Sequence, residues 1–151
     1  PRFQAVLDQI ATAAGGGTAG AAARAQAEGL FKGWVNAFNQ QLAATFSGES
    51  RVKVVDIASK FTDQITRPAA YGLTNVTLPV CGGPGITAVP ERPLGQCTAS
   101  VLSSTPPPAG GPTGADWWQR AMFADNFHPT PYGHSLMADQ VLEVLDDADW
   151  L

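Results

Sequence analysis

The residue types that could do acid–base chemistry gather in the stretch DNFHPTPYGH, residues 125–134. It places an acid, Asp125, three residues before a histidine, His128. On a tight turn, a carboxylate at this spacing can reach the imidazole Nδ1–H and fix the tautomer, which leaves Nε2 free to deprotonate a nucleophile. Pro129 and Pro131 stiffen the backbone around the histidine. The pattern alone also fits a capping aspartate beside a surface histidine.

Two predicted elements flank this turn and would position it. Residues 117–124, WWQRAMFA, predict a β-strand that leads into the turn. Beyond the turn, Thr130 is typical of a helix N-cap and Pro131 of a first helical position. The apolar face of this last helix would consist of Met137, Val141, Val144 and Leu145. Trp117 and Trp118 are expected to anchor packing, and the alternative is that they flank an acyl-chain cleft.

The N-terminal part of the chain predicts two helices. Residues 3–14 form the first, which the glycines at 15–17 end. A longer helix is predicted over residues 21–46, because apolar side chains recur at every fourth position. This stripe consists of Leu30, Trp34, Phe38, Leu42 and Phe46, with Phe31 and Val35 beside it. We expect the stripe to pack in the core.

The middle of the chain predicts a strand, a short helix and a long irregular excursion. Residues 51–57, RVKVVDI, predict a β-strand, and a long helix followed by a strand is the unit of an α/β sheet. Ser59 is expected to N-cap a helix that stops before Pro68. Residues 71–112 are rich in glycine and proline and show no regular pattern, which is typical of a functional or a disordered excursion.

Two cysteines, Cys81 and Cys97, bound the stretch CGGPGITAVPERPLGQC within this excursion. They lie too far apart for the short Cys-x-x-Cys metal and redox motifs. A disulfide that closes the loop is the favoured interpretation, and it would contribute about 3 kcal/mol in the chain-entropy model. Such a bond favours an oxidising compartment. Two unrelated buried thiols are the alternative.

Composition excludes several classes of function. The 151 residues are 44% hydrophobic and 15% charged, which favours a folded domain over disorder. The formal net charge is −4 and no Lys/Arg cluster occurs, which argues against a nucleic-acid partner. No apolar run approaches the roughly 18 residues of a transmembrane segment.

Two further motifs are weaker. His134 is the second of two histidines, so a zinc site is not expected, and His134 is expected to hydrogen-bond near the 125–128 turn. The residues NVT at 75–77 match the N-glycosylation pattern, which is common by chance.

The residues DNFHPT at 125–130 resemble the last motif block of the GDSL/SGNH hydrolases, in which Asp-x-x-His-Pro-Thr precedes the C-terminal helix. With the following Gly133-His134 they are similar to the bacterial phospholipase/lecithinase/hemolysin branch. Supporting stretches are Phe38-Asn39 with Leu42, VVD at 54–56, and YGLTNVT at 71–77 with a nearby cysteine. Together these matches span most of residues 30–145.

This resemblance implies a three-layer α/β/α flavodoxin-like fold and the hydrolysis of carboxylic esters by a Ser-His-Asp mechanism. His128 would be the general base and Asp125 its orienting acid. Lipid or short acyl esters would be the substrates, acyl transfer a possible side reaction, and no metal or organic cofactor is expected. With the disulfide, the resemblance implies a secreted or periplasmic bacterial enzyme.

The family's other functional residues do not map onto this chain. No Gly-Asp-Ser or Gly-x-Asn-Asp stretch occurs, and the seven serines lie in no nucleophile context. Because those blocks come earlier in the family, residues 1–151 are predicted to be the C-terminal portion of one SGNH domain. Its partner would be an upstream segment that carries the serine, and the chain alone is expected to be inactive. A non-catalytic binding or assembly domain and a metal-dependent hydrolase remain the alternatives.

Overall fold

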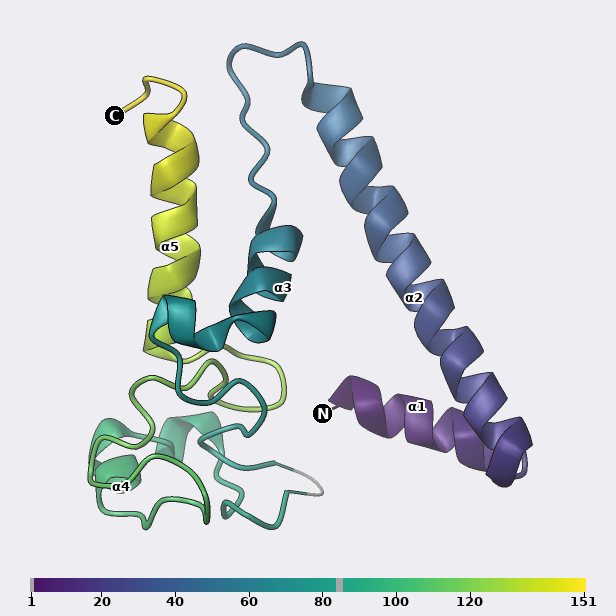
Figure 1. Ribbon diagram of the computed structural model, residues 1–151, viewed down its shortest axis with the longest axis vertical. Helices are drawn as coiled ribbons and strands as arrows, with labels where there is room; N and C mark the ends of the chain where they lie inside the picture. The colour runs from purple at the N-terminus through teal and green to yellow at the C-terminus, as the bar shows by residue number, and fades with distance from the viewer. Residues whose placement is uncertain (1, 84–85) are drawn as a thin grey trace. The chain divides into compact units, whose positions relative to one another are not determined.

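The computed structural model describes residues 2–83 and 86–151, which form helices and irregular segments (Figure 1). Pro1, and residues 84–85 of the predicted cysteine loop, lie outside the described residues. The α-helices are α1 (Arg2–Ala13), α2 (Gly17–Phe46), α3 (Ile57–Thr66), α4 (Ala99–Ser103) and α5 (Pro131–Asp146). Two 3₁₀ helices are η1 (Pro68–Tyr71) and η2 (Leu94–Gln96). The chain divides into two compact units, Pro1–Val54 and Val55–Leu151.

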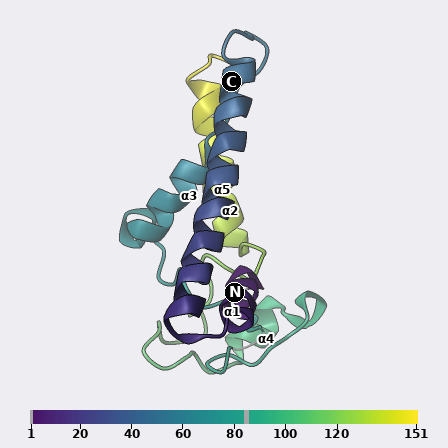
Figure 2. The same ribbon diagram turned by 90° about the vertical axis from the view of Figure 1, so that its right-hand side faces the viewer.

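The first unit is a pair of packed helices, α1 and α2. The predicted break between them is confirmed, because Gly15, Gly16 and Gly17 all adopt positive φ angles, which glycine adopts without steric cost. An ion pair between Asp8 and Arg24 joins the helices near this turn. The long helix begins at Gly17, four residues before its predicted start, and runs uninterrupted to Phe46 (Figure 2).

The prediction that the apolar stripe of α2 is core is wrong. Trp34 is 62% exposed and Phe38 is 66% exposed, and Leu30, Phe31 and Val35 are exposed as well. The reason is length: α1 is about 18 Å long and α2 about 45 Å, so α1 can cover only part of its partner. No helix in the described part of the chain is both long and apolar enough to cross a membrane.

Both predicted strands are also corrected. Residues 52–56 have no regular structure, and residues 117–120 form turns. The β-type pairing in the described part of the chain is limited to two isolated bridges, Asn75 with Ala121 and Phe123 with Pro129. A strand needs a neighbouring strand to satisfy its backbone groups, and residues 2–83 and 86–151 supply none. The predicted three-layer α/β/α arrangement is therefore not present in this range.

The helix expected near Ser59 exists, but its N-cap is different. Asp56 caps α3, and its Oδ1 accepts a hydrogen bond from the Ser59 backbone N–H at 3.0 Å. Aspartate is among the best N-cap residues, and from this position it can reach the third N–H of the helix. The helix stops at Thr66, before Pro68, as predicted.

The core of the second unit is formed by the excursion together with Trp117 and Ala121. Cys81 and Cys97 form the disulfide, with 5.7 Å between their Cα atoms. The buried residues of this core are Val80, Cys81, Val89, Leu102, Trp117 and Ala121. The indole N–H of Trp117, which is 2% exposed, donates to the carbonyls of Leu102 and Thr105, both at 3.1 Å. Trp117 is thus a packing anchor, as predicted. Residues 71–112 are largely irregular, but they contain η2 and α4, which the sequence pattern missed.

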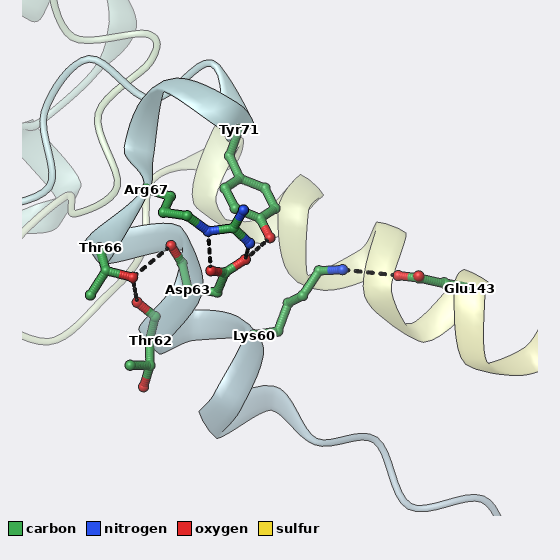
Figure 3. A network of polar contacts seen from close by, with 7 residues as sticks. All are labelled: Lys60, Thr62, Asp63, Thr66, Arg67, Tyr71 and Glu143. Carbon is green, nitrogen blue, oxygen red and sulfur yellow. Dashed lines mark hydrogen bonds and ion pairs between the residues drawn. The ribbon is translucent and has the colours of Figure 1, made fainter.

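Polar contacts fasten α5 to α3. The Gln140 side chain is buried and donates to the Asp56 carbonyl at 2.7 Å. Lys60 Nζ lies 3.1 Å from Glu143 Oε2 (Figure 3). On α3, the Asp63 carboxylate accepts hydrogen bonds from Arg67 and from the Tyr71 hydroxyl. Both bonds lower the pKa of Asp63, and the bond from Arg67 has the larger effect. The Gln140 and Glu143 contacts hold α5, the helix that begins at Pro131.

Candidate active site

The segment before the Asp125–His128 turn is held by the backbone beside the disulfide. The Val80 N–H donates to the Phe123 carbonyl at 3.0 Å. The Cys81 N–H donates to the Ala124 carbonyl at 2.7 Å. Residues 121–124 therefore enter the turn on a path fixed by the edge of the buried core.

The turn is closed by its own backbone bonds. The Ala124 N–H donates to the His128 carbonyl at 2.8 Å, and the Thr130 N–H donates to the Met122 carbonyl at 2.9 Å. These bonds bring the chain back on itself across residues 125–128. These two bonds restrict the backbone torsions of the turn, and they thereby fix the position of His128.

Helix α5 starts directly after this turn. Thr130 is its N-cap, and the buried Thr130 hydroxyl accepts from the Gly133 N–H at 3.0 Å and donates to the Ala121 carbonyl. The predicted cap and the proline at the first helical position are confirmed. A Cβ at Gly133 would lie 2.7 Å from the Met122 carbonyl oxygen, so only glycine lets the helix approach the segment this closely.

The Asp125 carboxylate takes part in three hydrogen bonds, two of them with His128. Asp125 Oδ2 lies 2.8 Å from His128 Nδ1, which is the contact that the spacing predicts. Asp125 Oδ1 accepts from the Phe127 N–H at 2.7 Å and from the His128 N–H at 2.6 Å. The carboxylate is thereby fixed by the same turn that carries the imidazole, and the neutral ring carries its proton on Nδ1.

The electrostatics of Asp125 favour its charged form. Burial raises the pKa of the Asp125 carboxyl, but hydrogen bonds from the His128 backbone and ring and from the Phe127 backbone together outweigh burial. The pKa of Asp125 is therefore below its usual value. At neutral pH the carboxylate is charged and accepts all three bonds.

The imidazole is accessible. The His128 side chain is 51% exposed, and the Asp125 carboxylate occupies its Nδ1. Phe127 is 78% exposed and its ring contacts the imidazole edge to face, with ring centroids 5.1 Å apart. An apolar surface thus adjoins the imidazole. Phe127 carried no recognised signal in the sequence.

Asn126 is a second neighbour that the sequence did not reveal. Its Oδ1 is buried and hydrogen-bonds to no group in the described residues. Its amide lies directly against Gly83, where an added Cβ would come within 2.6 Å of Asn126 Nδ2. The two residues are far apart in sequence, so no local pattern could have paired them.

Other candidate residues lie apart from this pair. His134 is exposed on the first turn of α5, and its backbone N–H donates to the Thr130 carbonyl at 2.9 Å. The Asn75 side chain closes a turn by donating to the Leu78 carbonyl at 2.7 Å. In residues 2–83 and 86–151, no serine hydroxyl hydrogen-bonds to His128, and no three His, Cys, Asp or Glu side chains gather as metal ligands.

Comparison with known proteins identifies the family of the chain. The model of the GDSL-like lipase/acylhydrolase family matches residues 18–141, a range that includes Asp125, His128 and both cysteines. No curated protein and no solved structure matches the chain. The family is enzymatic and its fold is the SGNH fold. The chain, over most of its length, thus belongs to the GDSL-like lipase/acylhydrolase family.

Proposed function

We propose that this chain supplies the general base of a carboxylic ester hydrolase. His128 is the base, and Asp125 orients its ring. The observation that carries the proposal is the 2.8 Å contact between Asp125 Oδ2 and Nδ1 of a half-exposed His128. Family membership supports the reaction class.

In this mechanism His128 Nε2 takes the proton of a serine hydroxyl as the serine oxygen attacks the ester carbonyl. The protonated imidazole then gives that proton to the departing alcohol. Water attacks the acyl-serine in the second half of the reaction, again through His128. If a second alcohol replaces water, the product is a transferred acyl group. Asp125 stabilises the imidazolium formed in each half.

The serine and the oxyanion donors would lie on a segment upstream of these residues. Residues 1–151 would then be the C-terminal portion of a single SGNH domain, with residues 71–112 as its excursion. The substrates would be lipid or short acyl esters, and the exposed Phe127 offers an apolar surface for them. The Cys81–Cys97 disulfide is consistent with an extracellular location, and we place the enzyme outside the cell or in the periplasm of a bacterium.

The test uses the two histidines of the chain as a matched pair. In the protein that carries the serine segment, His128→Ala should lower kcat for ester hydrolysis by about 10²–10⁴-fold. His134→Ala, at an exposed position outside the pair, should leave kcat unchanged. Hydrolysis that survives His128→Ala would remove His128 from the mechanism.

A second candidate is a non-catalytic assembly domain, favoured by the exposed apolar side chains of α2. In that case Asp125 and His128 would form only a structural hydrogen bond. His128→Ala would then weaken the fold without changing ester hydrolysis by the assembled protein. Measuring both thermal stability and hydrolysis for this variant separates the two candidates.

A further inference from the structure

We propose that the disulfide-bonded loop positions the candidate catalytic pair, with Gly83 and Asn126 as the positioning residues. This inference rests on the proposed function for its consequence in catalysis, but the geometry it invokes can be measured independently. Neither residue needs to touch substrate. Their effect would pass through the backbone that carries Asp125 and His128.

The first observation is the continuity between the disulfide and the turn. Cys81 is bonded to Cys97, and its own N–H donates to the carbonyl of Ala124, the residue directly before Asp125. The Cys81 carbonyl accepts from the Arg92 N–H at 2.8 Å, which ties the far side of the loop to the same residue. A single buried residue thus connects the loop closure to the start of the catalytic turn.

The second observation is the contact between Gly83 and Asn126. A Cβ at position 83 would lie 2.6 Å from Nδ2, 2.7 Å from Oδ1 and 2.8 Å from Cγ of Asn126. The three atoms therefore occupy the space that a Cβ at position 83 would need. Asn126 lies between Asp125 and His128, so a displacement of its buried amide would act on the turn that both residues share.

The third observation is the buried Asn126 Oδ1, which has no hydrogen-bond partner in the described residues. A buried unpaired acceptor destabilises the fold, because it has lost its bond to water without replacement. Within the described residues, Asn126 Oδ1 therefore contributes no hydrogen bond that would hold the side chain. We infer that shape, the fit of its amide on Gly83, is what keeps the side chain in place.

The test compares two glycines of the same loop. Gly83→Ala inserts a methyl group against Asn126, whereas Gly95→Ala inserts one where no atom lies within 4 Å. NMR of the imidazole nitrogens in the intact chain reports whether His128 keeps its proton on Nδ1, with exposed His134 as the internal reference. We expect Gly83→Ala to shift His128 toward the mixed tautomers of a free imidazole, and Gly95→Ala to leave it as in the unmodified chain.

The kinetic arm uses the protein that carries the serine segment. A misplaced base lowers kcat rather than substrate binding, so Gly83→Ala should lower kcat on the order of tenfold with little change in KM. Gly95→Ala should match the unmodified enzyme. An unchanged His128 tautomer together with unchanged kcat in Gly83→Ala would overturn the proposal.

A double-mutant cycle covers the case in which Gly83→Ala unfolds the chain. Asn126→Ala removes all three atoms that the new methyl group would meet. If Gly83 acts through Asn126, the effect of Gly83→Ala on the His128 tautomer and on stability shrinks in the Asn126→Ala background. Additive effects would show that the two residues do not act on each other, and the proposal would fail. Because the tautomer needs no activity, this result stands apart from the His128→Ala test of function.

Discussion

At the scale of single residues, the candidate site depends on one carboxylate that accepts three hydrogen bonds. Asp125 Oδ1 takes two backbone N–H groups, and Oδ2 faces His128 Nδ1. Both oxygens are thus needed as acceptors. An amide in the same place would have one acceptor and one donor.

Asp125→Asn should therefore abolish most catalysis while the turn persists. The amide oxygen can still accept the backbone bonds, which leaves the NH₂ group facing Nδ1 and favours the wrong imidazole tautomer. In the protein that carries the serine segment, we expect kcat to fall by about 10²–10⁴-fold while the chain stays folded at neutral pH. The variant is less stable than the unmodified chain, because the neutral amide binds the backbone N–H groups more weakly. The control is Asp116→Asn, at an exposed position outside the pair. Steady-state kinetics with equal activity in both variants would contradict the role of Asp125.

Asp125 also gives a signed pH dependence of stability. Its pKa in the folded chain is lowered from 3.8, so the unfolded chain binds the proton more readily. The stabilisation is fully present above the unfolded pKa and is lost as the pH falls through the lower, folded pKa. The difference in unfolding free energy between the unmodified chain and Asp125→Asn should therefore shrink as the pH falls from about 5 through the unfolded carboxyl pKa and below it. Denaturant titrations at several pH values measure it, and a gap that grows on acidification would be the wrong sign.

Residue spacing predicted the Asp125–His128 contact because both partners lie on one turn. It could not predict the contact of Gly83 with Asn126, because that pair forms only after the disulfide loop folds back. Contacts within one turn can be predicted from residue spacing, whereas contacts between distant segments depend on the tertiary structure.

At the scale of elements, the start of α5 links helix formation to the site. The Thr130 hydroxyl both caps the helix at Gly133 and bonds the Ala121 carbonyl, and Thr130 is 1% exposed. The same residue donates its N–H to Met122. Thr130 therefore caps α5 with its hydroxyl and closes the turn with its backbone N–H.

Thr130→Val keeps the volume but removes the hydroxyl, so the buried Gly133 N–H and the Ala121 carbonyl both lose a partner. We expect this change to lower the free energy of unfolding by about 1–3 kcal/mol. Thr62→Val is the matched control, because the exposed Thr62 hydroxyl bonds only a carbonyl of its own helix. Denaturant unfolding measures the free energy of unfolding of both variants. An equal decrease in the two variants would mean that the Thr130 cap contributes no more stability than the Thr62 hydroxyl does.

Helices were predicted better than strands for a physical reason. The glycine break at 15–17 and the Thr130 cap act within a few residues, so they are visible in sequence. A strand at residues 51–57 or 117–124 needs a pairing partner elsewhere, and the described residues contain none. The α2 stripe shows the same limit, since its period predicted a helix correctly but could not say what covers its apolar face.

At the scale of the whole molecule, two of the four tryptophans, Trp117 and Trp34, lie in opposite environments. Trp117 is buried in the disulfide core, whereas Trp34 is exposed on α2. A family domain built on the SGNH fold would bury an apolar helix face against a sheet, because the two layers share one core. We therefore assign the cover of the α2 stripe to the upstream segment that we propose carries the serine.

This assignment predicts a change in solvent access at Trp34 alone. In residues 1–151 by themselves, iodide should quench Trp34 fluorescence strongly and Trp117 weakly, because iodide reaches only exposed indoles. In the protein with the upstream segment, Trp34 should become protected while Trp117 is unchanged. Trp34→Phe isolates the contribution of Trp34, because Trp150 is also exposed and quenchable. In residues 1–151 by themselves this change should lower the quenchable fraction, and in the protein with the upstream segment it should alter that fraction little. If Trp34 is quenched equally in both, the stripe is free in the assembled enzyme, and the upstream segment must pack elsewhere.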